Sequence, residues 1–111
     1  MKLAVIGSRN IQVVISDADL PNGVDEIVSG GAVGVDRSAA KYAKEHHIKL
    51  TEFLPDYDRY GRCAPLKRNE QIADYADEAL AFWNGSSRGT LHTIRLFHQK
   101  GKRVTIIKIE S

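Results

Sequence analysis

Residues 26–36, Glu-Ile-Val-Ser-Gly-Gly-Ala-Val-Gly-Val-Asp, contain the transition that decides the fold of this 111-residue chain. Residues 26–29 form a short run typical of a buried strand, and Gly30-Gly31 ends it. A helix then begins, because one face is marked at helical spacing by Val35, Ala39, Tyr42, Ala43 and His46. A strand, a glycine turn and a helix in this order form the repeating unit of parallel α/β sheets.

The same alternation extends in both directions from this segment. Further strands are predicted at residues 2–6, 48–54, 78–83 and 103–109, and further helices at 65–75 and 90–100, with a loop at 56–64. Residues Ile11, Val14, Ile15 and Ala18 also have helical spacing. We therefore predict another helix between Asn10, a good N-cap, and Pro21, although residues 12–15 would also suit a strand.

Helical connections between all five strands predict an α/β fold of the Rossmann-like type. Such a fold has three layers, α/β/α, with a five-stranded and mostly parallel sheet between the helices. We expect one domain over residues 1–111, because the length suits a single core and no linker interrupts the pattern.

The composition excludes several classes of protein. Hydrophobic residues make up 42% and charged residues 27%, which is typical of a globular chain. The single cysteine, Cys63, has no partner for an internal disulfide, and no Cys/His cluster has zinc spacing, so we expect no metal or cofactor. A net charge of +2 is too weak to indicate a nucleic-acid partner. Without a membrane-spanning run or signal peptide, we expect a cytoplasmic protein.

Three polar, glycine-containing segments follow predicted strands at one edge of the sheet, where ligands bind in open α/β folds. Glycines allow a close approach of the backbone, helix N-termini attract anions, and Ser, Thr and Arg donate hydrogen bonds to phosphate. Neither a GxGxxG fingerprint nor a Gly-Lys-Ser/Thr phosphate loop is present. The candidate phosphate and ligand residues in these segments are Gly7, Ser8, Arg9, Gly30, Gly31, Gly34, Asp36, Ser86, Ser87, Arg88, Gly89 and Thr90.

Several of these positions also have purely structural interpretations. Asp36 would stabilise the free N–H groups of a helix first turn as readily as it would organise a ligand loop. Trp83 would either stack on a base or pack at the end of its strand. Tyr57 and Tyr60 would either cover the site or lie on the surface.

Three segments resemble motifs of the YspA-like branch of the SLOG superfamily, which also includes DprA/Smf and the Lonely-guy phosphoribohydrolases. They are residues 29–36 (SGGAVGVD), Arg68-Asn69 and residues 81–90 (AFWNGSSRGT). The resemblance implies a Rossmann-like SLOG domain that binds a nucleotide or a derivative such as AMP or ADP-ribose. It also places Arg68 and Asn69 among the ligand-binding residues. Relatives commonly dimerise, so a homodimer is an expected assembly.

The resemblance to Lonely-guy enzymes is partial at the catalytic positions. Their pattern is an Arg-Lys pair on a helix and a later PGGxGTxxE loop, in which the Arg and the last Glu are catalytic. Here Arg68 matches the Arg, Asn69 replaces the Lys, and Thr93 replaces the Glu. Hydrolysis of an N-glycosidic bond needs a carboxylate, which Thr93 does not supply.

Two main functions therefore follow from the sequence, beside a third, single-stranded DNA binding as in DprA, which would need a basic stripe that the net charge of +2 does not reveal. The first is a nucleotide-binding module or ligand sensor without turnover. The alternative is a nucleoside monophosphate phosphoribohydrolase of Lonely-guy type, with Arg68 as its candidate catalytic residue and Asp36 or Glu70 as an unrecognised acid.

Overall fold

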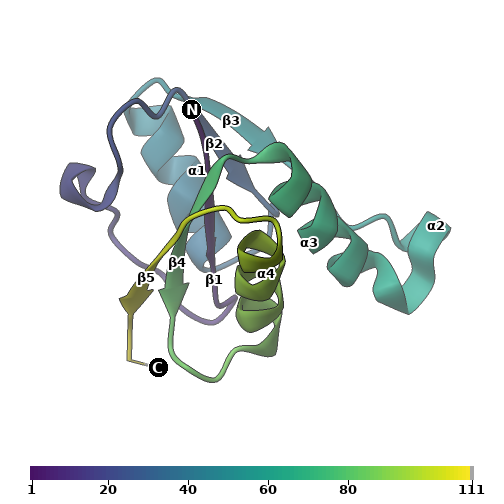
Figure 1. The fold of residues 1–111 in the computed structure, drawn as a ribbon. Helices are drawn as coiled ribbons and strands as arrows, with labels where there is room; N and C mark the ends of the chain where they lie inside the picture. The colour runs from purple at the N-terminus through teal and green to yellow at the C-terminus, as the bar shows by residue number, and fades with distance from the viewer. Residues whose placement is uncertain (111) are drawn as a thin grey trace.

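The computed structural model describes residues 1–110, in which five parallel strands form one sheet between helices (Figure 1). The strands are β1 (Lys2–Gly7), β2 (Glu26–Ser29), β3 (Lys49–Glu52), β4 (Glu78–Trp83) and β5 (Val104–Lys108). The helices are α1 (Val35–Glu45), the single turn α2 (Tyr57–Tyr60), α3 (Ala64–Tyr75) and α4 (Arg88–Gln99), with 3₁₀ helices at Asp17–Asp19 and Gly61–Cys63.

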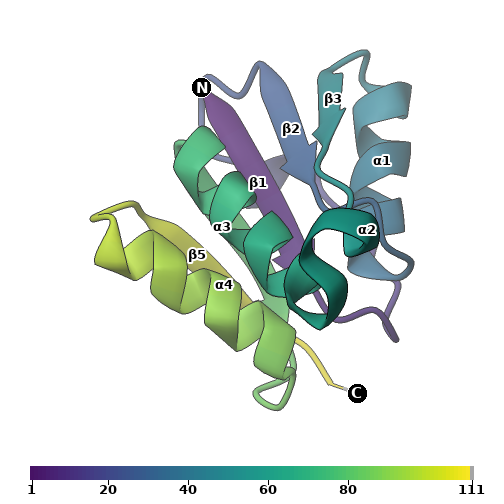
Figure 2. The same ribbon diagram turned by 90° about the vertical axis from the view of Figure 1, so that its right-hand side faces the viewer.

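Alternating side chains of β1 direct the helices to opposite faces of the sheet. Leu3 and Val5 pack in the cluster that contains α1, whereas Ala4 and Ile6 pack in the cluster that contains α3 and α4. Figure 2 shows the sheet between α1 and the α3–α4 pair. A strand buried on both faces needs apolar residues at every position, which explains the continuous apolar run of β1. The predicted three-layer α/β fold is therefore confirmed.

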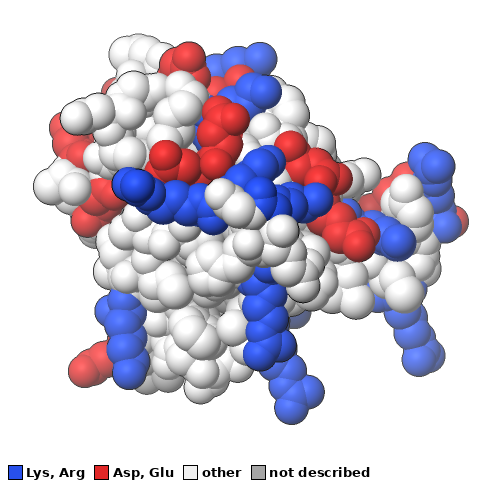
Figure 3. Space-filling model, in the orientation of Figure 1, with Lys and Arg blue, Asp and Glu red and all other residues white. Residues whose placement is uncertain are grey.

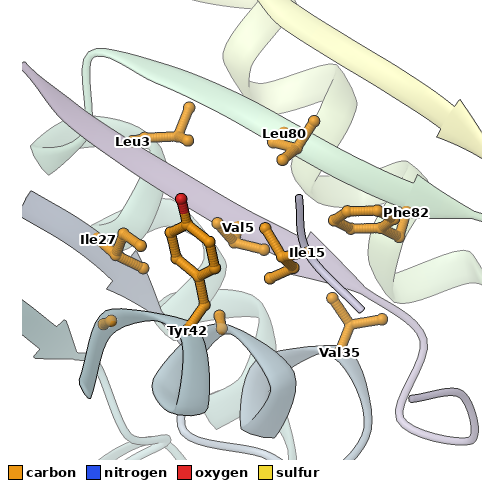
Figure 4. Close-up of a cluster of buried hydrophobic side chains, with 10 residues drawn as sticks. Leu3, Val5, Ile15, Ile27, Val35, Tyr42, Leu80 and Phe82 are labelled. Carbon is orange, nitrogen blue, oxygen red and sulfur yellow. The ribbon is translucent and has the colours of Figure 1, made fainter. Parts of the chain in front are cut away.

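The predicted helix between Asn10 and Pro21 is wrong. Residues 11–16 have no regular structure, and only Asp17–Asp19 form a 3₁₀ helix. Exposure alternates along this segment: Ile15 is buried, while its neighbour Val14 is 94% exposed. In Figure 4, Ile15 points toward Val5 and Phe82 in the core beside α1. The β-branched side chains here are stiff and favour extended backbone, which outweighs their helical spacing.

One smaller prediction also needs correction. The predicted loop at 56–64 contains α2 and a 3₁₀ helix, with Asp56 as the N-cap whose carboxylate accepts the Arg59 N–H.

The turn after α4 contains Lys102, which is only partly exposed. Its Nζ donates to the carbonyl oxygens of Ala73, Asp74 and Ala76 at the end of α3, where a cation suits the helix dipole.

The strand order β3-β2-β1-β4-β5 reverses direction between β1 and β4. The chain builds outward from β1 to β3 and then returns to add β4 on the other side of β1. The loops after β1 and β4 therefore diverge toward opposite faces and leave a crevice between them. None of the helices in residues 1–110 has the length and apolarity to cross a bilayer.

Candidate functional site

A cleft of about 660 Å³ lies at the carboxyl ends of the strands, within the size range of small-molecule sites. The α2 turn stands at the same end of the sheet as the arrowheads of β1 and β2 (Figure 2). The lining residues come from the loops after β1, β2, β3 and β4 and from α2, α3 and α4: Ile6, Gly7, Ser8, Arg9, Asn10, Gly30, Gly31, Ala32, Asp36, Pro55, Tyr57, Pro65, Leu66, Arg68, Asn69, Ile72, Asn84, Ser86, Ser87, Gly89, Thr90 and Thr93.

The cleft brings together most of the residues predicted to form the site. Gly34 and Arg88 are the exceptions, since neither lines it. Sequence reasoning missed an apolar part of the lining around Pro55, Pro65 and Leu66. One signal could have revealed it, because Pro55 follows β3 and therefore belongs to the same edge of the sheet.

Gly34 holds the glycine loop, which we define as residues 30–36, against the loop after β1. Its φ of +75° lies in the region that favours glycine, and a methyl group there would lie 2.5 Å from the carbonyl oxygens of Ser8 and Arg9. The Val35 N–H also donates to the Ser8 carbonyl oxygen at 3.2 Å. Gly34 therefore shapes the cleft from behind its wall.

Arg68, on α3, braces the glycine loop from the opposite side. Its Nη1 donates to the Gly30 carbonyl oxygen at 2.7 Å, and its Nε donates to Asn69 Oδ1 at 3.0 Å. A methyl group at Gly30 would lie 2.4 Å from Arg68 Nη1, so only glycine permits this contact without a shift. Burial lowers the pKa of Arg68 from its ordinary value, and nearby Asp36 opposes that effect.

Asp36 closes the glycine loop on itself. Its Oδ2 accepts the Ala32 N–H at 3.1 Å, an arrangement that organises the loop. Burial raises the pKa of the Asp36 carboxyl, although the Ala32 hydrogen bond and the Arg68 charge both act to lower it. Asp36 also lies in the first turn of α1, where a carboxylate suits the helix dipole. Its surroundings therefore agree with both interpretations, stabilisation of the helix start and organisation of the glycine loop.

A hydrogen-bond chain connects Arg68 to α4. Because a guanidinium only donates, Asn69 must present Oδ1 to Arg68 and therefore Nδ2 to His92 Nδ1, at 3.2 Å. That contact requires an unprotonated His92 Nδ1. Asn69 is buried, so its contacts help to fix the Arg68 side chain.

The serine loop, residues 84–87, forms the opposite wall through local contacts. Asn84 Oδ1 accepts the N–H groups of Ser86 and Ser87, and Ser87 Oγ caps α4 by accepting the Thr90 N–H. Trp83 Nε1 donates to the Ser87 carbonyl oxygen at 3.1 Å. Trp83 does not line the cleft, so its contact favours the packing interpretation.

The N-terminus of α4 offers free donors beside this wall. Within residues 1–110, the backbone N–H groups of Arg88 and Gly89 form no hydrogen bond, and the helix dipole places partial positive charge there. The Arg88 side chain is exposed. The structure thus supplies an anion site from backbone N–H groups and hydroxyls more than from the Arg88 side chain.

The catalytic carboxylate expected of a Lonely-guy enzyme has no counterpart at the matching position. Thr93 is 3% exposed, and its Oγ1 donates to the Gly89 carbonyl oxygen at 3.1 Å. Glu70 does not line the cleft. Among the described residues that line the cleft, Asp36 is the one with an acidic side chain.

The charged side chains on the face in Figure 3 and the metal-ligating side chains of residues 1–110 form no further site. On the face in Figure 3, basic side chains lie beside acidic ones, above an extensive area without charged residues. In residues 1–110, no group of three or more His, Cys, Asp or Glu side chains is arranged to hold a metal ion.

Comparison with known proteins finds one family model that resembles part of the chain. Residues 17–60 match the model of the YspA, cpYpsA-related SLOG family. The match includes the glycine loop, whereas Arg68-Asn69 and residues 81–90 lie outside it, so their resemblance stays a prediction. Neither a curated protein nor a solved structure matched the chain. The match of residues 17–60 and the parallel α/β fold support a relation to the YspA, cpYpsA-related SLOG family.

Proposed function

We propose that this protein binds a nucleotide or nucleotide derivative, of the AMP or ADP-ribose kind, without hydrolysing it. The observation that carries the proposal is the cleft at the reversal of strand order, whose lining includes both hydrogen-bond donors at the start of α4 and apolar side chains such as Pro55 and Leu66. The match of residues 17–60 to a SLOG family model supports a nucleotide-related ligand.

In this proposal the phosphate binds at the start of α4. The free N–H group of Gly89 and the hydroxyls of Ser86 and Thr90, which line the cleft, would donate to its oxygens. Arg9, across the cleft, would add a charge-assisted hydrogen bond. No metal is needed to hold a phosphate with this many donors.

The base would bind at the α2–α3 end of the cleft. Tyr57 is 57% exposed and Leu66 is 47% exposed, and both line the cleft. Exposed apolar side chains in a cleft lose unfavourable contact with water when a ring covers them, and a tyrosine ring stacks on any base. Tyr57→Ala should therefore weaken the binding of AMP more than that of ribose 5-phosphate.

We propose that the ligand is not hydrolysed because Thr93 occupies the position of the catalytic Glu. A buried hydroxyl that donates to a backbone carbonyl oxygen neither stabilises an oxocarbenium ion nor activates water. The protein would hold its ligand and report it, as a sensor or an accessory subunit does.

Calorimetric titration with AMP, ADP-ribose and NAD, followed by chromatography of each mixture, tests the proposal. We expect saturable binding of at least one compound and no released base. A ligand at 100 times its dissociation constant should add about 2.7 kcal/mol to the unfolding free energy, so a thermal-shift screen can select the compounds. No binding by any of the three would contradict the proposal.

One observation favours a phosphoribohydrolase as the second candidate. Asp36 is a carboxyl group in the cleft with a pKa raised by burial, as is common for general acids. Release of adenine from AMP, lost in both Arg68→Ala and Asp36→Asn, would establish this activity and overturn the binding-only proposal.

A further inference from the structure

The lining of the cleft contains a hydrogen-bond acceptor that the protein leaves open. Asp36 uses Oδ2 to accept the Ala32 N–H, and within residues 1–110 its Oδ1 forms no hydrogen bond. Every buried side-chain N or O atom of these residues has a partner, so Oδ1 is accessible to solvent. Since Asp36 lines the cleft, a bound ligand can reach this oxygen.

Arg68 places open donors in the same part of the cleft. A guanidinium has five N–H groups, of which Arg68 directs one from Nε to Asn69 and one from Nη1 to Gly30. Its Nη2 forms no hydrogen bond within the described residues. The two engaged groups hold the guanidinium plane in place, so the remaining donors have a fixed direction.

We propose that Asp36 and Arg68 together recognise the vicinal 2′,3′-diol of a ribose, which makes the site selective for ribonucleotides over 2′-deoxyribonucleotides. The inference rests on the proposed nucleotide-binding function. A diol has two hydroxyls that donate and accept, and an adjacent carboxylate and guanidinium supply one acceptor and one donor to match.

The elements that carry these groups agree with this assignment. The ribose of a nucleotide lies between its phosphate and its base. Here Asp36 and Arg68 belong to the glycine loop and α3, whereas the α4 N-terminus forms the anion-binding wall and Tyr57 belongs to α2. A carboxylate after the second strand that accepts a ribose hydroxyl is also a recurring device of dinucleotide-binding α/β folds.

Desolvation makes this recognition sensitive to a missing hydroxyl. Asp36 is partly withdrawn from water, and a ligand that covers it without donating a hydrogen bond leaves Oδ1 unpaired. An unpaired charged group costs about 1.5–3 kcal/mol, which corresponds to a loss of affinity of roughly 10- to 100-fold.

Calorimetry of the unmodified protein with AMP and 2′-deoxy-AMP tests the inference without any variant. We expect 2′-deoxy-AMP to bind at least about tenfold more weakly. Ribose 5-phosphate and 2-deoxyribose 5-phosphate form a second pair, in which the same preference should appear without a base. Equal affinities within both pairs would overturn diol recognition and leave nucleotide binding standing, whereas no binding of any of the four overturns both.

The Asp36→Asn variant then tests whether Asp36 causes the preference for AMP over 2′-deoxy-AMP. We expect weaker AMP binding and a ratio of AMP to 2′-deoxy-AMP affinity that falls to about two or less. Glu52→Gln is the matched control, because Glu52 is an exposed carboxylate that influences the pKa of Asp36 and does not line the cleft. An unchanged ratio in a folded Asp36→Asn protein would exclude Asp36 from this role.

Discussion

The two walls of the cleft are built in different ways. The glycine loop is held by distant parts of the chain: Arg68 donates to Gly30 from α3, and Gly34 packs on the backbone of the loop after β1. The serine loop is held by its own residues, through Asn84 and the Ser87 cap. The conformation of a wall held by tertiary contacts depends on the packing of the whole fold. The conformation of a wall held locally depends on a few neighbouring side chains.

Substitutions in the two walls should therefore have different effects, one mainly on the stability of the fold and the other mainly on binding. Changes in the glycine loop should affect the whole fold, because its contacts join β1, α1 and α3. Changes in the serine loop should affect the start of α4 and the anion that we propose to bind there. The four predictions below compare the two walls, from the largest expected effect to the smallest.

Gly34→Ala and Gly85→Ala form the sharpest pair. Both glycines have positive φ, +75° and +86°, but a methyl group at Gly34 meets backbone oxygens, whereas one at Gly85 meets nothing within 4 Å. We expect Gly34→Ala to lower the unfolding free energy by about 3 kcal/mol or more and Gly85→Ala by about 1 kcal/mol. Urea denaturation measures both, and equal losses would show that the two walls are held alike.

Arg68→Ala and Arg88→Ala compare the arginines of the two walls. Arg68 is partly buried and lines the cleft, whereas Arg88 is exposed and does not. We expect Arg68→Ala to weaken AMP binding by about 10- to 100-fold and Arg88→Ala by less than about threefold, mainly at low salt. Calorimetry at two salt concentrations distinguishes them. A larger loss of AMP affinity in Arg88→Ala than in Arg68→Ala would indicate that the anion binds beside the Arg88 side chain, outside the cleft.

Ser87→Ala tests the local support of the serine loop. The Ser87 hydroxyl caps α4 and contacts Thr90 Oγ1 at 3.0 Å, so its loss should cost about 1 kcal/mol of unfolding free energy. Ser86→Ala is the matched control, because Ser86 is exposed and caps no helix. Thermal unfolding of both variants measures the difference, and a loss of equal size in Ser86→Ala would rule out a specific cap.

Asp36→Asn should produce a small gain in stability that depends on pH. Burial raises the pKa of Asp36 above its ordinary value of 3.8, so the folded protein binds this proton more tightly than the unfolded chain. The resulting stabilisation is full below about pH 3.8 and is lost as pH rises through the folded pKa. The variant should therefore melt at a higher temperature than the natural protein at pH 7, with a gain that disappears in acid. A lower melting temperature at pH 7 would mean that pairing with Arg68 outweighs burial.

The strands and three long helices could be predicted because each carries its own local pattern. β2 and β4 begin and end at the predicted residues, 26–29 and 78–83, and α1 begins at Val35. The helix between Asn10 and Pro21 could not be excluded locally, since its spacing fits both structures. The core beside α1 has room for Ile15 on an extended chain, and that decides the conformation.

The candidate site was predictable in its glycines and hydroxyls, because these residues follow strands that end at one edge. The roles of individual residues were not. Gly34 packs on the loop after β1 without lining the cleft, Arg88 does not line the cleft, and Asn69 contacts both Arg68 and His92. Each of these outcomes depends on a neighbour that is distant in sequence.

The sequence by itself determined the α/β class, the parallel sheet and the edge at which polar loops gather, because periodicity, glycine turns and helix caps are local properties. Only the tertiary structure decided that Arg68 braces Gly30 across 38 positions of the chain, that Asp36 keeps one oxygen open, and that Leu66 and Tyr57 line the far end of the cleft. Those arrangements come from packing between elements, which fixes distances that no local pattern contains.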